Sequence, residues 1–324
     1  MRLLKLVPDN TNIPFLKWRN IAIWFSIALI VASIALVTIR GLNFGVDFAG
    51  GLMIEARFEK PVELDDLRAT VNDAGAGDGN LQTFGDPRTV AIRLPLPEGD
   101  DAAVQAVVKQ VQAKIEASNP DVEFRRVETV SGKVSNELIR DGALAMALAM
   151  LGISIYIWFR FEWQFGVGAL FALVHDVALT MGFFALTQLE FDLNTVAALL
   201  TIIGYSLNDT VVVYDRIREN LRKYRKMNME SVLNLSINET LSRTIVTSLS
   251  MIIALGTLVL LGGSVLFGFS VAMLLGIGIG TFSSIFVSAP LLLWLGVTPD
   301  SFIAHEATAE DRLKAKKADE RGRV

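Results

Sequence analysis

The chain has 324 residues, of which 52% are hydrophobic, and its mean hydropathy is +0.45. This composition is too apolar for an ordinary soluble protein and indicates a membrane protein. The sequence has no cysteine, which excludes disulfides, thiolate metal sites, iron–sulfur clusters and cysteine nucleophiles. Its net charge of −4, without one large basic block, argues against nucleic acid as the main partner.

Six stretches are long enough to be transmembrane helices, because about 20 mostly apolar residues cross about 30 Å of hydrocarbon. They are residues 21–39, 142–159, 165–187, 193–213, 244–261 and 266–295. The first is too long for the core of a signal peptide and lacks an Ala-x-Ala cleavage site, so we expect a retained anchor. The last exceeds one crossing, which predicts a tilt or an end outside the bilayer near Gly268. Within it, Gly276, Gly278 and Gly280 include one G-x-x-x-G spacing, which predicts close helix packing.

The basic residues of the short loops predict the orientation, because lysine and arginine favour the cytoplasmic side. Residues 1–20 and 214–243 are rich in them, so we expect both segments, and after six crossings the tail 296–324, in the cytoplasm. The turn 188–192 has two carboxylates and no basic residue and is expected outside. Tyr214, Ile217, Leu221 and Tyr224 share one face, which predicts an amphipathic helix along the inner membrane surface.

Residues 40–141, between the first two spans, are long enough for a folded domain outside the membrane. Strands are predicted at 52–58, 81–84, 89–94 and 122–130, and helices at 64–74 and 101–117. The order β-α-β-β-α-β is that of a ferredoxin-like domain. The fold class is therefore a six-helix membrane protein with an α+β extracytoplasmic domain. No catalytic cluster stands out in this domain, and we expect it to pack and to contact protein partners.

Three ionisable residues fall inside the predicted spans, where a charge costs about 2.5–3.5 kcal/mol at the helix centre. They are His175, Asp176 and Asp209, and Arg243 stands immediately before the fifth span. Tyr205, Asn208, Asp209 and Val212 follow helical spacing and form a polar stripe that we expect to face the bundle interior or a wet cavity. Asp209 and Arg243 enter the membrane at comparable depth, so an ion pair between the fourth and fifth helices is possible.

Two interpretations of these residues remain open on the sequence alone. Asp209 and Arg243 neutralise each other, or extend to the interface, and only fix helix packing. Alternatively, Asp209 binds and releases protons while movement of Arg243 switches its charge. His175 and Asp176 point about 100° apart on a helix and cannot both face one partner. In one alternative, His175 or Asp176 extends a proton path to which Asn208 also belongs. In the other, His175 and Asp176 form a hydrogen-bonded packing pair.

Five motifs resemble the SecF branch of the SecD/SecF family, whose members are bacterial protein-export membrane proteins. These are Gly-Leu-Asn-Phe-Gly-Val-Asp-Phe-Ala-Gly-Gly at 41–51, Val-Ser-Gly-Lys-Val at 130–134, Val-His-Asp at 174–176, the long run 204–219 that contains Asn208 and Asp209, and Ser-Arg-Thr at 242–244. The resemblance covers all six spans, and the motif in the fourth span is highly specific.

The resemblance implies a subunit that pairs with SecD in a pseudo-symmetric unit similar to resistance-nodulation-division transporters. Such a unit associates with the SecYEG channel in the bacterial cytoplasmic (inner) membrane and uses the proton motive force to assist late export of polypeptides. It implies a proton relay through Asp209 and Arg243, no cofactor or metal, and no enzymatic activity.

Two other functions compete with this one. A small-molecule efflux subunit is disfavoured because it commonly needs two long outer domains, whereas this chain has one. A scaffold that stabilises the translocon without conducting protons remains an alternative.

Overall fold

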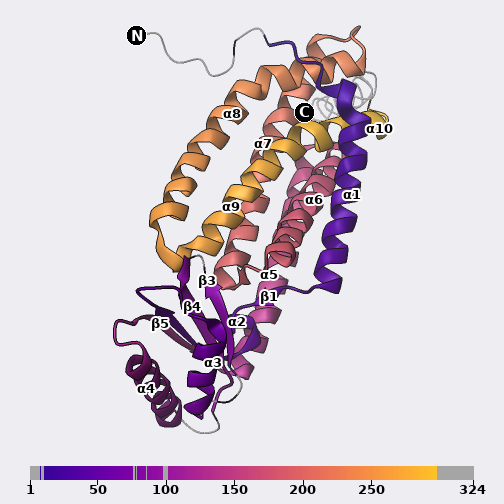
Figure 1. Ribbon diagram of the computed structural model, residues 1–324. Coiled ribbons are helices and arrows are strands. Elements are labelled where there is room, and N and C mark those ends of the chain that lie inside the picture. The colour runs from indigo at the N-terminus through magenta and orange to yellow at the C-terminus, as the bar shows by residue number, and fades with distance from the viewer. Residues whose placement is uncertain are drawn as a thin grey trace, which may run out of the picture.

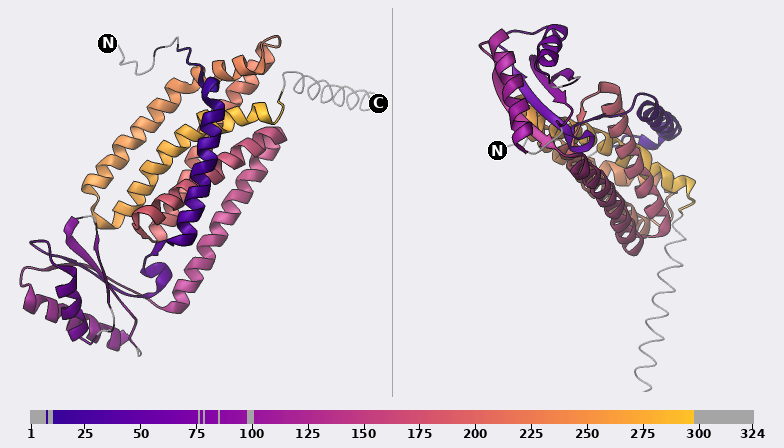
Figure 2. Two further views of the ribbon diagram at one scale, coloured as in Figure 1. Left: turned by 45° about the vertical axis from the view of Figure 1, so that its right-hand side comes forward. Right: turned by 90° about the horizontal axis from the view of Figure 1, so that it is seen from below.

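The computed structural model describes Pro8 and residues 11–75, 77, 79–84, 86–97 and 101–297. Long helices lie side by side in a bundle, and a smaller α/β domain sits at one end of it (Figures 1 and 2). We call the end that carries this domain the outer end and the opposite end the inner end. Two predicted segments lie partly or wholly outside the described residues. Of the N-terminal segment 1–20, residues 1–7, 9 and 10 are not described, and of the tail 296–324, residues from 298 onward are not described.

Six helices of the described part are long and apolar enough to cross a membrane, as the sequence predicted. They make the chain a multi-pass membrane protein. A short 3-10 helix, η1 Phe15–Trp18, leads into the first. The helices are α1 Arg19–Ile39, α5 Gly132–Arg160, α6 Trp163–Thr187, α7 Leu193–Lys223, α8 Met229–Leu261 and α9 Gly263–Ser283, the last continued by two short elements.

Three of these helices begin at a polar side chain that caps the free backbone N–H groups of the first turn. Ser131 accepts from the N–H of Val134 before α5, Asp192 from that of Thr195 before α7, and Asn228 from that of Ser231 before α8. Each such cap stabilises a helix start by about 1 kcal/mol. The starts of these helices are therefore fixed by local sequence.

The α/β domain at the outer end contains four strands and two helices in the order β-α-β-β-α-β. They are β2 Gly51–Arg57, α3 Leu64–Asp73, β3 Asn80–Phe84, β4 Asp86–Leu94, α4 Asp101–Ser118 and β5 Glu123–Val130. The sheet order is β3-β4-β2-β5, and all neighbours are antiparallel. Leu52 and Ile54 of the central strand β2 are buried in one core with Val71 of α3 and Val111 of α4, so both helices cover the same face of the sheet.

A short connector fastens this domain to the bundle. It contains β1 Asn43–Phe44 and the helix α2 Val46–Ala49, and β1 pairs in parallel with β6 Glu190–Phe191 in the turn between α6 and α7. Gly51 has φ 117°, and a Cβ there would lie 2.8 Å from the carbonyl oxygen of Leu94, so only glycine fits.

One ion pair joins the domain to the same turn. Arg93 of β4 lies 3.2 Å from Glu190, and both side chains are largely buried. Arg93 also donates to the side chain of Asn43, at 2.8 Å. Burial raises the pKa of Glu190 above its ordinary value, and the positive charge of Arg93 offsets only part of that rise.

The expected amphipathic helix over 214–224 is wrong as a separate surface element. Residues 214–223 continue α7 without a break, and α8 starts again at Met229. Tyr214, Ile217 and Leu221 are buried in one core cluster with residues of α8. The apolar face is covered by a neighbouring helix, which the pattern of one segment cannot distinguish from a membrane surface.

The last predicted span is not one regular helix. It starts at Gly263, and after α9 the chain forms a π-helical segment, η2 Ser284–Ser288, and then α10 Ala289–Trp294. Pro290 has no N–H to donate to the carbonyl of Phe286, so the regular α-helical pattern breaks there. π segments are rare and often lie at functional sites.

Glycines set how closely α9 approaches its neighbours. A Cβ on Gly276 would lie 2.3 Å from Ile202 of α7, and one on Gly280 would lie 3.1 Å from Ser206 of the same helix. The predicted close packing at this G-x-x-x-G spacing is confirmed for these two glycines, whereas Gly278 faces open space. Contact between α7 and α9 brings Ser206 beside the end of α9.

Candidate functional site

Asp209 lies on α7 in the inner half of the bundle and is only 4% exposed. Within the described part of the chain, its Oδ2 has no hydrogen-bond partner, and neither has the hydroxyl of Tyr205 one turn earlier. Buried polar atoms without partners are rare in folded proteins because each costs about 1–3 kcal/mol. Burial of Oδ2 of Asp209 is therefore unfavourable, and no hydrogen bond from the described residues compensates for it.

Arg243 lies on α8, and its charge attracts the Asp209 carboxylate. The side chain is exposed, and no contact within 4.0 Å joins these two described residues, so the possible ion pair is not formed here. Asn208 is also exposed, whereas Asp209 beside it is buried. The predicted polar stripe therefore divides: Asp209 faces the interior, and Asn208 faces outward from this chain.

Asp176 is buried inside the bundle, with 1% of its surface exposed, and its carboxylate contacts three side chains. Its Oδ2 accepts hydrogen bonds from Ser206 Oγ of α7 at 2.5 Å and from Ser283 Oγ, the last residue of α9, at 2.9 Å. Its Oδ1 lies 2.9 Å from Nδ1 of His175. One carboxylate on α6 thus ties three helices together, and we call Asp176, His175, Ser206 and Ser283 the Asp176 cluster.

His175 contacts its neighbour in sequence rather than pointing away from it. The ring is fully buried and stacks on Phe282 with centroids 6.3 Å apart. Among the described residues, its Nε2 has no hydrogen-bond partner. Of the two alternatives for these residues, the hydrogen-bonded pair is present, because a side-chain torsion turns the imidazole toward the carboxylate although the two Cα–Cβ directions differ by about 100°.

The Asp176 cluster and Asp209 are neighbours along α7. Ser206 precedes Asp209 by three residues, which is about 4.5 Å along the axis at 1.5 Å per residue. Tyr205 and Ser206 both lie within one turn of Asp209. Polar groups therefore lie within about one helical turn of each carboxylate. No hydrogen bond among the described residues connects the two carboxylates directly.

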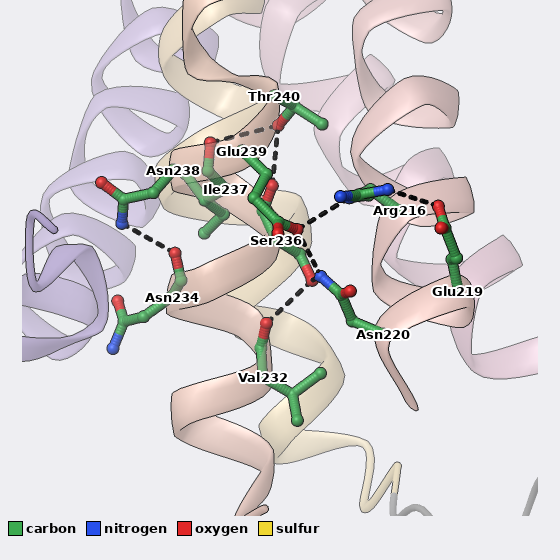
Figure 3. Close-up of polar contacts among 10 residues, drawn as sticks. All are labelled: Arg216, Glu219, Asn220, Val232, Asn234, Ser236, Ile237, Asn238, Glu239 and Thr240. Atoms are coloured by element: carbon green, nitrogen blue, oxygen red, sulfur yellow. Dashed lines mark hydrogen bonds and ion pairs between the residues drawn. The ribbon is translucent and has the colours of Figure 1, made fainter. Parts of the chain in front are cut away.

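A polar network at the inner end joins α7 to α8 (Figure 3), and the sequence analysis missed it. Glu239 accepts from Arg216 Nε at 2.7 Å and from Asn220 at 2.6 Å, and Asn220 also donates to Ser236 at 3.0 Å. Because Glu239 precedes Arg243 by one turn, this network fixes the part of α8 that carries Arg243. The available signal was the polar character of residues 229–243, in which Ser236, Glu239 and Arg243 recur at helical spacing.

Residues 13–16, which lead into α1, are held to the same segment of α8. Asn238 accepts from the backbone N–H of Ile13 and donates to its carbonyl, both at 2.9 Å, and Asn234 accepts from the N–H of Leu16 at 3.1 Å.

No three His, Asp or Glu side chains of the described residues gather in a way that would hold a metal ion.

Comparison with known proteins places these residues in a family. Residues 110–298 match the model of the family described as "Protein export membrane protein SecD/SecF, C-terminal", and residues 35–62 match the "SecD/SecF GG Motif". The chain is 46% identical over 290 residues to the protein translocase subunit SecF of Rickettsia akari, covering 89% of this chain and 94% of that protein. It is 44% identical over 300 residues to the SecF of Cereibacter sphaeroides, covering 91% and 93%.

Two solved structures share the fold. The crystal structure of SecDF, a translocon-associated membrane protein from Thermus thermophilus, is 34% identical with a TM-score of 0.78, covering 88% of this chain and 39% of that one. The crystal structure of SecDF in a super-membrane-facing form is 33% identical with a TM-score of 0.67, covering 95% and 41%. The chain thus spans about two fifths of the SecDF chains.

Proposed function

Because the chain belongs to the SecD/SecF family of protein export membrane proteins, we propose that it uses the proton motive force to assist polypeptide export, with Asp209 as the carboxylate that binds and releases protons. A role in protein export follows from the family. The proton relay is the further step, and it depends on one observation: Oδ2 of Asp209 is buried without a partner among the described residues.

The energetics favour a switch between two states of Asp209. A charged carboxylate at this place is costly in a membrane, so either a proton or the guanidinium of Arg243 must neutralise it. Arg243 is near enough to attract the carboxylate and too far for an ion pair. Movement of α8 that closes this gap would release the proton, and movement that opens it would favour uptake. Each charge moved through 100 mV supplies about 2.3 kcal/mol for such a movement.

His175 and Asp176 serve in this proposal as a second proton-holding site, one turn farther toward the outer end. Asp176 is held by three side chains, whereas Nε2 of His175 lacks a partner in the described chain. That free ring nitrogen suits exchange of a proton, and the ordered carboxylate fixes the ring. Asn208, exposed beside Asp209, would contact the path from the side of a partner subunit.

The exposed positions suggest where the partner lies. Asn208 and Arg243 are polar side chains that are exposed on α7 and α8, two helices long and apolar enough to cross a membrane. A lipid-facing position would be costly for both, so we propose that a SecD subunit covers this face. The assembled pair would act with the SecYEG channel on the exported polypeptide, and the α/β domain, which we propose to be ferredoxin-like, would contact that polypeptide or the partner.

We propose the orientation from the basic loops. The inner end, with residues 1–20, 214–243 and 296–324, would face the cytoplasm, and residues 40–141 would lie outside the bacterial inner membrane. The chain would act without a cofactor and without catalysing a covalent reaction.

The test compares Asp209→Asn with wild type in vesicles that contain this chain, its SecD partner and the channel. The variant keeps the shape of the side chain and removes its charge, so proton flux and proton-driven export should both be lost. Asp141→Asn is the control, because that carboxylate is exposed on α5 and pairs only with its neighbour Arg140 among the described residues. Wild-type flux and export by Asp209→Asn would refute the proposal.

A scaffold that does not conduct protons is the competing function, and the helix-joining role of Asp176 favours it. It predicts that Asp209→Asn combined with Arg243→Gln leaves export unchanged while Asp176→Asn lowers the stability of the complex. Small-molecule efflux receives no support from the single outer domain.

A further inference from the structure

The turn between α5 and α6 at the inner end forms a cationic surface with α7. Arg160, the last residue of α5, pairs with Asp215 at 2.9 Å, and Arg218 donates to the carbonyl of Arg160 at 3.2 Å. Both guanidinium groups stack on the ring of Phe161, at 5.1 and 5.2 Å from its centroid. The ring and the carbonyl therefore hold two arginines close together in spite of their like charge.

A cavity of about 430 Å³ opens beside these arginines. It is lined by Arg160, Asp215, Arg218, Glu219, Arg222 and Lys223. Four cationic side chains thus face two carboxylates. One of these carboxylates, on Glu219, is bound by Arg216 at 2.6 Å, so the cavity keeps an excess of positive charge. Nε of Arg218 is buried and has no hydrogen-bond partner within the described residues.

A second cavity, of about 790 Å³, shares Arg160 and Arg218 with the first. The rest of its lining is mainly aromatic, with Trp158 75% exposed, Phe159 88% and Trp163 56%, and it also includes Phe161, Gln164 and one carboxylate, Glu162. Over the two cavities, four cationic side chains thus face three carboxylates, and the excess of positive charge remains. Tryptophan is enriched where a membrane protein meets the lipid headgroups. The two cavities together thus have an aromatic side, formed by Trp158, Phe159 and Trp163, and a cationic side, which starts at Arg160 and Arg218. We expect the aromatic side to face the bilayer.

We propose that these adjoining cavities bind an anionic phospholipid, with its phosphate at Arg160 and Arg218 and its acyl chains along Trp158, Phe159 and Trp163. Guanidinium forks bind phosphate oxygens in pairs, and basic pockets between membrane helices bind anionic headgroups. A zwitterionic lipid brings its own cation into a site that already has an excess of positive charge. A free phosphate ion would leave the aromatic wall unused.

The site lies near the relay without belonging to it. Arg218 follows Asp209 on α7 by nine residues, and Arg216, between them, holds Glu239 of α8. A bound lipid would therefore fix the inner ends of α5, α6 and α7 against one another. The proposal stands whether or not Asp209 carries protons.

Native mass spectrometry of the full chain in detergent, titrated with phosphatidylglycerol or phosphatidylcholine, tests the site. We expect phosphatidylglycerol to bind at least tenfold more tightly, and Arg160→Gln with Arg218→Gln to remove that preference. The matched control is Arg225→Gln with Lys226→Gln, because both residues are exposed at the same end, outside the two cavities, and the loss of charge is equal.

Each alternative outcome overturns the proposal. Equal binding of the two lipids by the unchanged protein would show that headgroup charge is not recognised, and this comparison needs no variant. Equal loss in the control pair would show a diffuse basic surface. Inorganic phosphate or glycerol 3-phosphate that displaces the lipid completely at equal concentration would show an ion site that ignores acyl chains. If the arginine pair fails to fold, Trp158→Ala with Trp163→Ala should still weaken lipid binding several-fold, and unchanged binding there would count against the site.

Discussion

The hydrogen bonds of the Asp176 cluster give a prediction about stability that does not depend on export. Replacing Ser283 by alanine removes one of the two hydroxyl donors to Oδ2 of Asp176. A hydrogen bond to a charged group contributes about 1.5–3 kcal/mol in proteins, whereas polar contacts between membrane helices average about 0.6 and reach about 1.7 kcal/mol. Because Asp176 is 1% exposed and water cannot replace the lost donor, the upper part of the membrane range applies. We expect Ser283→Ala to lower the free energy of unfolding by about 1.5 kcal/mol.

A double-mutant cycle separates this bond from general packing. In the Asp176→Asn background the acceptor is neutral, and bonds to it are about half as strong, so the same serine replacement should cost about 0.7 kcal/mol. Unfolding in mixed micelles, followed by circular dichroism, measures all four proteins. Ser154→Ala is the matched control, because among the described residues that hydroxyl bonds only to the carbonyl of Met150 in its own helix. An equal cost of Ser283→Ala in both backgrounds would refute the assigned bond.

Three further changes have expected outcomes. Gly276→Ala places a methyl group 2.3 Å from Ile202, so it should cost about 1–3 kcal/mol of unfolding free energy and be partly rescued by Ile202→Ala; an unchanged single variant would contradict the packing. Burial raises the pKa of Glu190 above its ordinary value of about 4.3, so the folded state binds its proton more tightly, and this contribution to stability is lost as pH rises from that value through the folded-state pKa. Glu190→Gln should remove that slope from thermal unfolding above about pH 4, and an unaltered slope would speak against it. Glu239→Gln weakens the bonds to Arg216 and Asn220, so amide exchange at the start of α8 should become faster; equal rates would show that the network does not hold that segment.

The spans and the elements of the α/β domain were predictable because their signals are local. A run of about 20 apolar residues and a 3.6-residue or 2-residue period are visible in the sequence without knowledge of neighbours. The caps Ser131, Asp192 and Asn228 are local as well, and they fix where three helices begin. The joint between domain and bundle was not predicted, because the pairing of β1 with β6 joins residues that are far apart in the chain.

The misplaced surface helix has a tertiary cause, whereas the irregularity in the last span has a local one. Residues 214–224 have the periodicity of a surface helix, but α8 covers their apolar face. The last span reads as one apolar run, and the π segment η2 follows from Pro290, a single residue within it. Proline inside an apolar stretch is a usable signal for a break in regular helix geometry.

The residues of the site were predictable to different degrees. Burial of Asp209 follows from the cost of a charge in lipid, and it needs no partner to be named. The partners of Asp176 could not be read from the sequence, because hydroxyl residues are common in membrane helices and each can bond to its own backbone. What selects Ser206 and Ser283 is the close approach of α9 to α7 at Gly280.

This approach links the Asp176 cluster to the irregular end of α9. Ser283 donates to Asp176 and is followed at once by η2, so the bond lies at the boundary between regular and π-helical backbone. A regular α-helix has i→i+4 hydrogen bonds throughout, whereas the π segment has i→i+5 bonds, so the regular pattern is already interrupted beside Ser283. Loss of the carboxylate in Asp176→Asn would weaken the bond to Ser283, and the irregular segment η2 lies directly next to that bond. A displacement at the cluster would therefore change the position of α10 at the inner end, where it packs against α7 and α8.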